Sequence, residues 1–138
     1  MIVRTFNVDK INSVLKHPDI WPNIADDDVH IDEFTPPIND NMHYLFSDGI
    51  LFILHPEGDA LQIHANVLKS ERGRAAEAAK AALVYGFMGL NADKIIAKIP
   101  EKYANVVRFA HMFMDLESVV GGVNNFVLEK SKWALSVK

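Results

Sequence analysis

Three polar side chains alternate with apolar ones along one segment in the middle of the sequence. Residues 60–68 read ALQIHANVL, and in a β-strand Gln62, His64 and Asn66 would point away from the apolar face. A sheet covered by helices on both faces should be nearly continuously apolar, so this polar row indicates a strand face that lines a cleft. A half-exposed strand with a solvated face would give the same pattern, and both interpretations stay open.

A basic junction containing glycine follows this segment. KSERGR (69–74) leads into residues 75–90, an alanine-rich stretch that is the strongest helix in the sequence. The first N–H groups of a helix have no partner within it and, with the helix dipole, form an anion site. Gly73 would let the backbone approach a phosphate closely, and Arg72 and Arg74 add positive charge. A solvated basic helix end is the alternative interpretation.

Other chemically capable residues show less order. The acidic run at 26–28, with His30, Asp32 and Glu33, has no standard ligand spacing, so we expect no metal site. Cysteine is absent, which removes disulfides and thiolate chemistry. The spacing of four other histidines suggests no partners for them: His17, His30, His43 and His55. His111, Met112 and Met114 lie in the expected helix 103–115, where packing and surface positions are favoured over a cofactor site.

The elements that must position these residues follow from local signals. Most of the apolar runs are bounded by glycine, proline, asparagine or aspartate, as turns require. The expected order is a strand at 2–6, a helix capped by Asn7 or Asp9 and ending near His17-Pro18, strands at 43–46, 50–54 and 60–68, helix 75–90, strand 94–100, helix 103–115, and a closing hairpin of 117–123 and 125–135. The helix at 75–90 has apolar positions around most of its circumference, which predicts a helix packed within a core.

Composition limits the class of protein. With 138 residues, 49% hydrophobic and 23% charged, the chain is expected to form one globular domain over residues 1–138. The net charge of −4 gives no electrostatic reason to expect a nucleic-acid partner. No apolar run has the roughly 18 residues of a membrane span, and the N-terminus has no apolar signal segment. We therefore expect no membrane partner and a cytoplasmic location.

The order of elements, taken with the motif VLKSERGRAAEAAKAAL, resembles the Gcn5-related N-acetyltransferase (GNAT) superfamily. The resemblance implies an α/β (α+β) fold: a central mixed, mostly antiparallel sheet of about six or seven strands flanked by helices. Arg72 aligns with the leading arginine of the superfamily's central motif, while Ala75 and Glu77 stand where two glycines, or glycine and alanine, are usual. In YANVVRFAHMFM, Asn105 matches the family's asparagine, and Met112 replaces the tyrosine found in many members.

The resemblance implies acyl transfer from acetyl-CoA to an amine, with the following site residues. Coenzyme A would bind through its pyrophosphate at residues 72–77 and through its pantetheine arm at Asn105. A backbone N–H near residues 66–68 would polarise the thioester. His64 is the candidate base, since an imidazole pKa near 6.5 suits that task; Glu57 and Asp59 are alternatives. In many family members the tyrosine replaced here by Met112 protonates the departing thiolate, and Tyr85 or Tyr103 could take that role. The cofactor-binding set is Asn66, Val67, Leu68, Arg72, Gly73, Arg74, Ala75, Ala76, Glu77 and Asn105.

Two other functions remain possible from the sequence. Because of the departures at Ala75, Glu77 and Met112, the chain could be a catalytically inactive GNAT-fold assembly or binding factor. It also resembles small GNAT-like proteins of tailed phages, some of which act in particle assembly, and this resemblance would place it in the host cytoplasm. A regulatory domain that binds another nucleotide is the third possibility. The acceptor would be a small-molecule or protein amine, and the final hairpin would permit a homodimer.

Overall fold

The computed structural model describes residues 1–136, and these form two compact units. Unit 1 comprises Met1–Ile53 and Ala65–Ala82; unit 2 comprises Leu54–His64 and the chain from Leu83 onward. The seven strands follow the hydrogen-bonded order β1-β2-β3-β4-β5-β7-β6. β4 and β5 are parallel, whereas β1 and β2, β5 and β7, and β6 and β7 pair antiparallel. This mixed, mostly antiparallel sheet with flanking helices confirms the predicted fold class.

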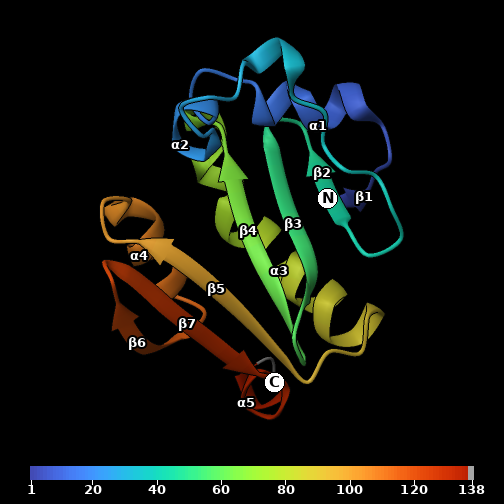
Figure 1. Cartoon of the computed structure of the whole chain (residues 1–138). Coiled ribbons are helices and arrows are strands. Elements are labelled where there is room, and N and C mark those ends of the chain that lie inside the picture. Colours follow the sequence, from blue (N-terminus) through green and yellow to red (C-terminus); the bar gives the residue numbers. More distant parts are fainter. Residues whose placement is uncertain (137–138) are drawn as a thin grey trace. The chain divides into compact units, whose positions relative to one another are not determined.

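Unit 1 contains most of the N-terminal elements, whose strands and α-helices are labelled in Figure 1. In chain order these are β1 (Val3–Arg4), α1 (Val8–Leu15), α2 (Trp21–Ile24), the 3-10 helix η1 (Ile31–Glu33), β2 (His43–Ser47), the first half of β3 (Ile50–Glu57), the end of β4 (Ala60–Val67), the 3-10 helix η2 (Lys69–Arg74) and most of α3 (Ala75–Val84).

The first helix forms for the reasons that the sequence indicated. Asn7 caps α1, because its Oδ1 accepts a hydrogen bond from the Lys10 N–H at 3.1 Å. One face of α1 is buried, and its residues join Ile20, Tyr44 and Leu51 in the core of unit 1; these α1 residues are Ile11, Val14 and Leu15. The predicted capped helix is confirmed.

The β2–β3 hairpin requires glycine at its turn. Gly49 has a φ of +80°, in the left-handed region that glycine adopts without strain. A Cβ at this position would also lie 2.7 Å from the Cγ atom of Glu71, on η2. The turn is thus closed by both backbone conformation and close packing, as the Ser47-Asp48-Gly49 pattern predicted.

Unit 2 contains the hairpin tip of β3 and β4 and the C-terminal elements. These elements are the π-helix η3 (Tyr85–Gly89), β5 (Lys94–Pro100), α4 (Ala104–His111), β6 (Asp115–Val120), β7 (Val123–Glu129) and α5 (Lys130–Ser136). β5 pairs with β7 over its whole length, from Lys94↔Glu129 to Pro100↔Val123. The β6–β7 turn lies at Gly121-Gly122, both with positive φ, as predicted.

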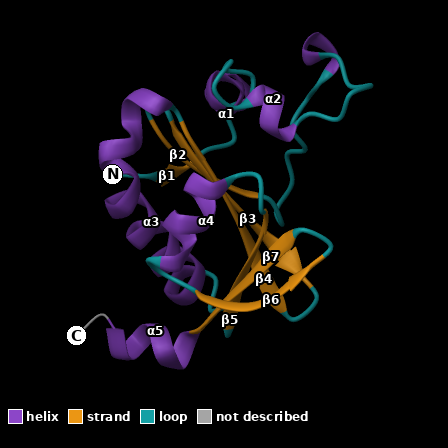
Figure 2. Ribbon diagram, turned by 90° about the vertical axis from the view of Figure 1, so that its left-hand side faces the viewer, coloured by secondary structure: helices purple, strands orange, loops and turns teal. Residues whose placement is uncertain are grey.

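The C-terminal segment differs from the prediction. The strand predicted to run to residue 135 ends at Glu129, and α5 follows (Figure 2). The helix buries the Trp133 side chain, which is 8% exposed. The centroid of its ring lies 4.9 Å from that of Phe87, and we attribute the helical conformation to this packing. The predicted helix at 103–115 is also shorter, because α4 ends at His111 and β6 begins at Asp115.

The alanine-rich helix is buried on one side only. Ala78, Ala79 and Ala82 are buried, whereas Lys80, Ala81 and Val84 are exposed. The prediction that it packs around most of its circumference is therefore wrong, because alanine-rich sequence reads as apolar even where the side chains face solvent. No helix within residues 1–136 is long and apolar enough to cross a membrane.

Candidate active site

Two of the three polar side chains on β4 are buried, and the third, His64, is half-buried. Gln62 is 8% exposed and Asn66 is 7% exposed, and the Asn66 Nδ2 group donates to the Leu51 carbonyl at 3.4 Å. Burying a polar side chain costs free energy unless it finds a partner. The interpretation of this row as the solvated face of a half-exposed strand is therefore wrong.

His64, in the same row, contacts a second histidine across the β3–β4 hairpin. The Nε2 atoms of His55 and His64 are 2.9 Å apart, and their ring planes differ by 15°. The ring centroids are 5.1 Å apart, which exceeds the nitrogen separation by about twice the centroid-to-nitrogen distance of an imidazole. The two rings consequently lie edge to edge, so the hydrogen bond between them is close to linear.

Sequence reasoning missed His55. The two histidines are nine residues apart, and the turn at Gly58-Asp59 brings them together. Two histidines on one side of a predicted hairpin would have been the signal for this contact, since diagonal neighbours on a sheet are within reach of long side chains. Both residues belong to unit 2.

The hydrogen bonds of His55 assign the tautomers of the pair. Its Nδ1 lies 3.2 Å from the Pro56 carbonyl oxygen, which can only accept, so Nδ1 carries a proton. In the neutral ring, Nε2 of His55 then accepts, and the donor is the Nε2–H of His64. The Nδ1 of His64 is left as a free acceptor: no hydrogen-bond partner for it occurs among residues 1–136.

The electrostatics keep His64 neutral. Burial lowers the pKa of His64 from 6.5 to about 4, and the charge of His55 lowers it further in the same direction. At pH 7 His64 is therefore an imidazole with a lone pair on Nδ1. This form can accept a proton, but its pKa of about 4 corrects the expected 6.5 and makes His64 a weaker base than an ordinary imidazole.

The backbone N–H groups of Val67 and Leu68, at the end of β4, differ in whether they already donate to β3 or its turn. The Leu68 N–H donates to the Gly49 carbonyl at 2.9 Å, so it is occupied. Successive N–H groups of a strand point to opposite edges, and the Val67 N–H therefore points away from β3. Along that other edge, β4 pairs with β5 at Leu61↔Ile95 and Gln62↔Ile96. His64 follows the last of these pairs by two residues.

The helix that carries the predicted phosphate site begins at Ala75, as predicted, but a 3-10 helix that was not predicted runs directly into it. Residues 69–74 form η2, and the Ala75 N–H donates to the Arg72 carbonyl, so this amide is used within the helix. The free amides of a first turn accordingly belong to the start of η2. There the Lys69 N–H donates to the Asp19 carboxylate at 3.0 Å.

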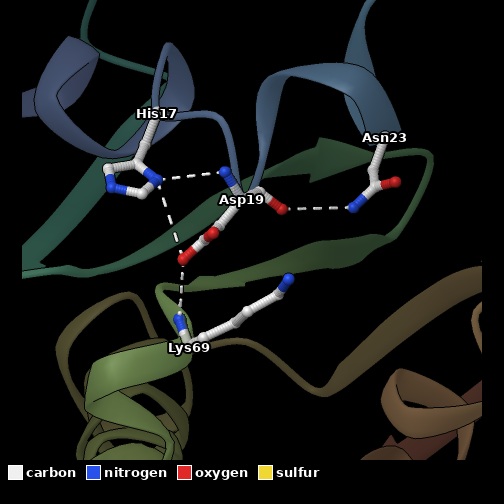
Figure 3. Close-up of polar contacts among 4 residues, drawn as sticks. All are labelled: His17, Asp19, Asn23 and Lys69. Atoms are coloured by element: carbon white, nitrogen blue, oxygen red, sulfur yellow. Dashed lines mark hydrogen bonds and ion pairs between the residues drawn. The ribbon is translucent and has the colours of Figure 1, made fainter.

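Asp19 is held in this capping position by its neighbours (Figure 3). Its own N–H donates to His17 Nδ1 at 3.0 Å, and its carbonyl accepts from Asn23 Nδ2 at 3.3 Å. A carboxylate at a helix N-terminus satisfies an orphan amide and is favoured by the helix dipole. Sequence reasoning did not find this contact, because Asp19 and Lys69 are 50 residues apart.

The two arginines of the motif differ in their surroundings. Arg74 binds Glu71 at 2.9 Å, and its guanidinium also donates to Ser47 Oγ and the Asp48 carbonyl, at 3.1 and 2.7 Å. Its charge therefore fastens η2 to the β2–β3 turn. Arg72 is exposed, and its guanidinium has no hydrogen bond or ion pair within residues 1–136. A Cβ at Gly73 would meet no atom within 4 Å, so the backbone at this residue is accessible.

The remaining motif residues are mostly on the surface. Glu77 is exposed and its carboxylate lies 3.2 Å from Lys80 Nζ, while Ala75 is buried and Ala76 is half-buried. Asn105 is exposed on α4, where its Oδ1 accepts a hydrogen bond from Arg108. This leaves the Nδ2 group of Asn105 as a donor. Met112, which the resemblance aligns with a tyrosine of many GNAT proteins, is 66% exposed.

The alternative candidates do not converge. Among residues 1–136, no group of three or more histidine, aspartate or glutamate side chains could hold a metal ion. His30 and Asp32 form an exposed pair, with 3.7 Å between Nδ1 and Oδ2. Asp59 lies 3.6 Å from Lys94 Nζ, and Glu57 is exposed at the end of β3.

The chain is similar in fold to solved structures of two N-acetyltransferases. A mutant of spermidine N-acetyltransferase SpeG from Vibrio cholerae matches with a TM-score of 0.61 and 15% identity, over 72% of this chain and 71% of that one. The N-acetyltransferase PseH from Campylobacter jejuni matches with a TM-score of 0.58 and 9% identity, over 67% and 70%. At these identities the likeness establishes a GNAT-like fold. No protein-family model matches the chain, and no curated protein matches it.

Proposed function

We propose that the chain is a GNAT-type N-acyltransferase that moves the acetyl group of acetyl-CoA to an amine. The observation that carries this proposal is His64: a neutral imidazole with a free Nδ1, on the central strand of a fold shared with N-acetyltransferases. A general base of this kind typically contributes 10²–10⁴-fold to a rate. The base makes the acceptor amine neutral, and therefore nucleophilic.

The other proposed roles follow from what each group has available. Arg72 offers an unpaired guanidinium to the pyrophosphate, beside the accessible backbone of Gly73. The Nδ2 group of Asn105 would donate to the pantetheine arm. The Val67 N–H would polarise the thioester carbonyl, because the Leu68 N–H is already bound to Gly49. Coenzyme A would have to displace the Asp19 carboxylate or bind beside it.

The reaction balances with these groups. The neutral amine would attack the thioester carbonyl carbon, so that a C–N bond would form as the C–S bond breaks. The amine loses one proton before attack and a second afterwards, and the second goes to the departing thiolate. Residues 1–138 would act as one acyltransferase domain.

The acceptor is proposed only as a class. SpeG is named for spermidine, and one of its structures is described as dodecameric. A small polar amine, or a protein amine, is accordingly the acceptor to test first, and a homo-oligomer is the assembly to look for. A cytoplasmic setting, or a host cytoplasm for a phage protein, fits acetyl-CoA as cofactor.

Calorimetry with acetyl-CoA, joined to a transfer assay on a panel of amines that includes spermidine, tests the proposal. Arg72→Glu should weaken acetyl-CoA binding roughly tenfold to a hundredfold, the value of a charge-assisted contact. Lys132→Glu is the matched control: it makes the same change of charge at an exposed site and loses only a surface ion pair with Asp115.

The outcomes separate the rival functions. Saturable binding and turnover, both reduced by Arg72→Glu and unchanged by Lys132→Glu, would support the transferase. Absence of binding at millimolar acetyl-CoA would refute it. In that case, stoichiometric capture of a partner protein would favour an assembly factor, and binding of another nucleotide would favour a regulatory domain.

A further inference from the structure

His55 and His64 form a chain of aligned hydrogen bonds, which side-chain packing alone does not require. A buried histidine is satisfied by one hydrogen bond to a carbonyl or to water. Here two imidazoles share one proton at 2.9 Å in nearly coplanar rings, and the outer imidazole donates in turn to an exposed carbonyl, that of Pro56. The result is a line of four ring nitrogens from His64 Nδ1 to the surface at His55 Nδ1.

We propose that His55 is the outlet of the base: it takes the proton that His64 receives from the acceptor ammonium and passes it to solvent. This inference rests on the proposed function and adds a positioning residue to it. His64 would touch the amine, whereas His55 would act through His64.

The transfer balances for each ring. The ammonium gives a proton to Nδ1 of His64, and its N–H electron pair becomes the lone pair of the neutral amine. The Nε2 proton of His64 moves to Nε2 of His55, and the Nδ1 proton of His55 leaves to water. Each ring gains one proton and loses one, so one proton has passed from amine to solvent. After the products leave, the reverse transfers restore the starting tautomers. His55 Nδ1 then takes one proton from water and His64 Nδ1 releases one to water, so the number of protons on the pair does not change.

A relay removes a cost that a lone histidine would carry. Burial opposes a charged His64, so a proton that stayed on it would make the imidazole an unfavourable cation. Passing a proton on as each one arrives keeps His64 neutral. The neighbouring charges do not substitute for His55: Lys94 of β5 faces Asp59 at 3.6 Å, and Glu57 and Lys98 are exposed.

The test uses variants of the 138-residue chain that separate the positioning of His64 from proton transfer. In His55→Gln the amide oxygen can still accept from the His64 Nε2–H, which keeps the ring in place but cannot carry a proton onward. His55→Ala removes both functions and leaves space for added imidazole. His30→Gln, at an exposed histidine paired with Asp32, is the control. Every assay contains a chelator, because two histidines can hold adventitious zinc.

We expect His55→Gln to lower kcat/KM on the order of tenfold or more while leaving acetyl-CoA affinity within twofold. The rate of His55→Ala should rise with imidazole concentration, whereas that of His30→Gln should not. Nitrogen-15 NMR of the wild type should show His64 protonated at Nε2 and unprotonated at Nδ1.

Each outcome decides the proposal. Wild-type turnover with an unchanged rate in His55→Gln, no response of His55→Ala to imidazole, or a proton on His64 Nδ1 would overturn the relay while leaving the transferase intact. A wild type that neither binds acetyl-CoA nor acetylates any amine would overturn both, and calorimetry identifies that case.

Discussion

Acid sensitivity of folding is the sharpest consequence of the half-buried His64. Its folded-state pKa of about 4, against 6.5 for an ordinary histidine, means that the unfolded chain binds this proton more tightly. The neutral form therefore contributes stability that is fully present above pH 6.5 and is lost as the pH falls from 6.5 towards 4. One pKa unit is worth about 1.4 kcal/mol, so the loss reaches about 2 kcal/mol at pH 5 and about 3 kcal/mol below pH 4.

The assay is urea unfolding at pH 7 and pH 5, followed by circular dichroism, for the wild type and two variants. His64→Gln should lose about 2 kcal/mol less than the wild type between these two pH values, because it has no group to titrate there. His30→Gln removes an exposed imidazole instead and is the control for the loss of a histidine. Equal pH dependence of wild type and His64→Gln would refute the reasoning, since it would mean that His64 titrates alike in both states.

Two further predictions concern stability. Gly86→Ala should cost about 1–3 kcal/mol from overpacking, offset by up to about 1 kcal/mol of helix propensity, because its Cβ would lie 2.7 Å from Ile95 Cδ1 and 3.0 Å from Leu54 Cδ2. Gly89→Ala, with ordinary contacts of 3.6 Å or more, should be neutral or stabilising; urea midpoints that rank the two variants the other way would contradict the packing argument. Asp19→Ala should cost about 0.5–2 kcal/mol by uncapping the first amide of η2, and an unchanged midpoint would show that water replaces the carboxylate without loss.

Features governed by neighbouring residues were predictable from the sequence. The cap at Asn7 and the glycine turn at Gly49 depend on a few adjacent residues, and both appear where predicted. The order of strands and helices followed in the same way, and with it the fold class. Local signals did not predict two features. One is the 3-10 helix η2 directly before α3. The other is the C-terminal helix, in which Trp133 packs on Phe87, a residue far away in the sequence.

The candidate site was less predictable than the fold. His64 could be selected because alternation on a strand is a local pattern. Its partner His55 depends on the hairpin register, and the Asp19 cap depends on a contact that no local rule anticipates. Arg74 matched the motif in sequence, yet its guanidinium is committed to the turn at Ser47-Asp48. Motif matching identifies residue types, whereas the availability of a charge depends on tertiary neighbours.

The interleaving of the two compact units has a consequence for synthesis on the ribosome. Every segment of unit 1 has been made once Ala82 is complete, so its core can assemble while the rest of the chain is still being translated. The hairpin tip Leu54–His64 is in a different position, because its strand partner β5 is made later, from Lys94 onward. Both histidines are therefore synthesised before β5, the strand that pairs with β4. The candidate base is among the last parts of the molecule to acquire its final surroundings.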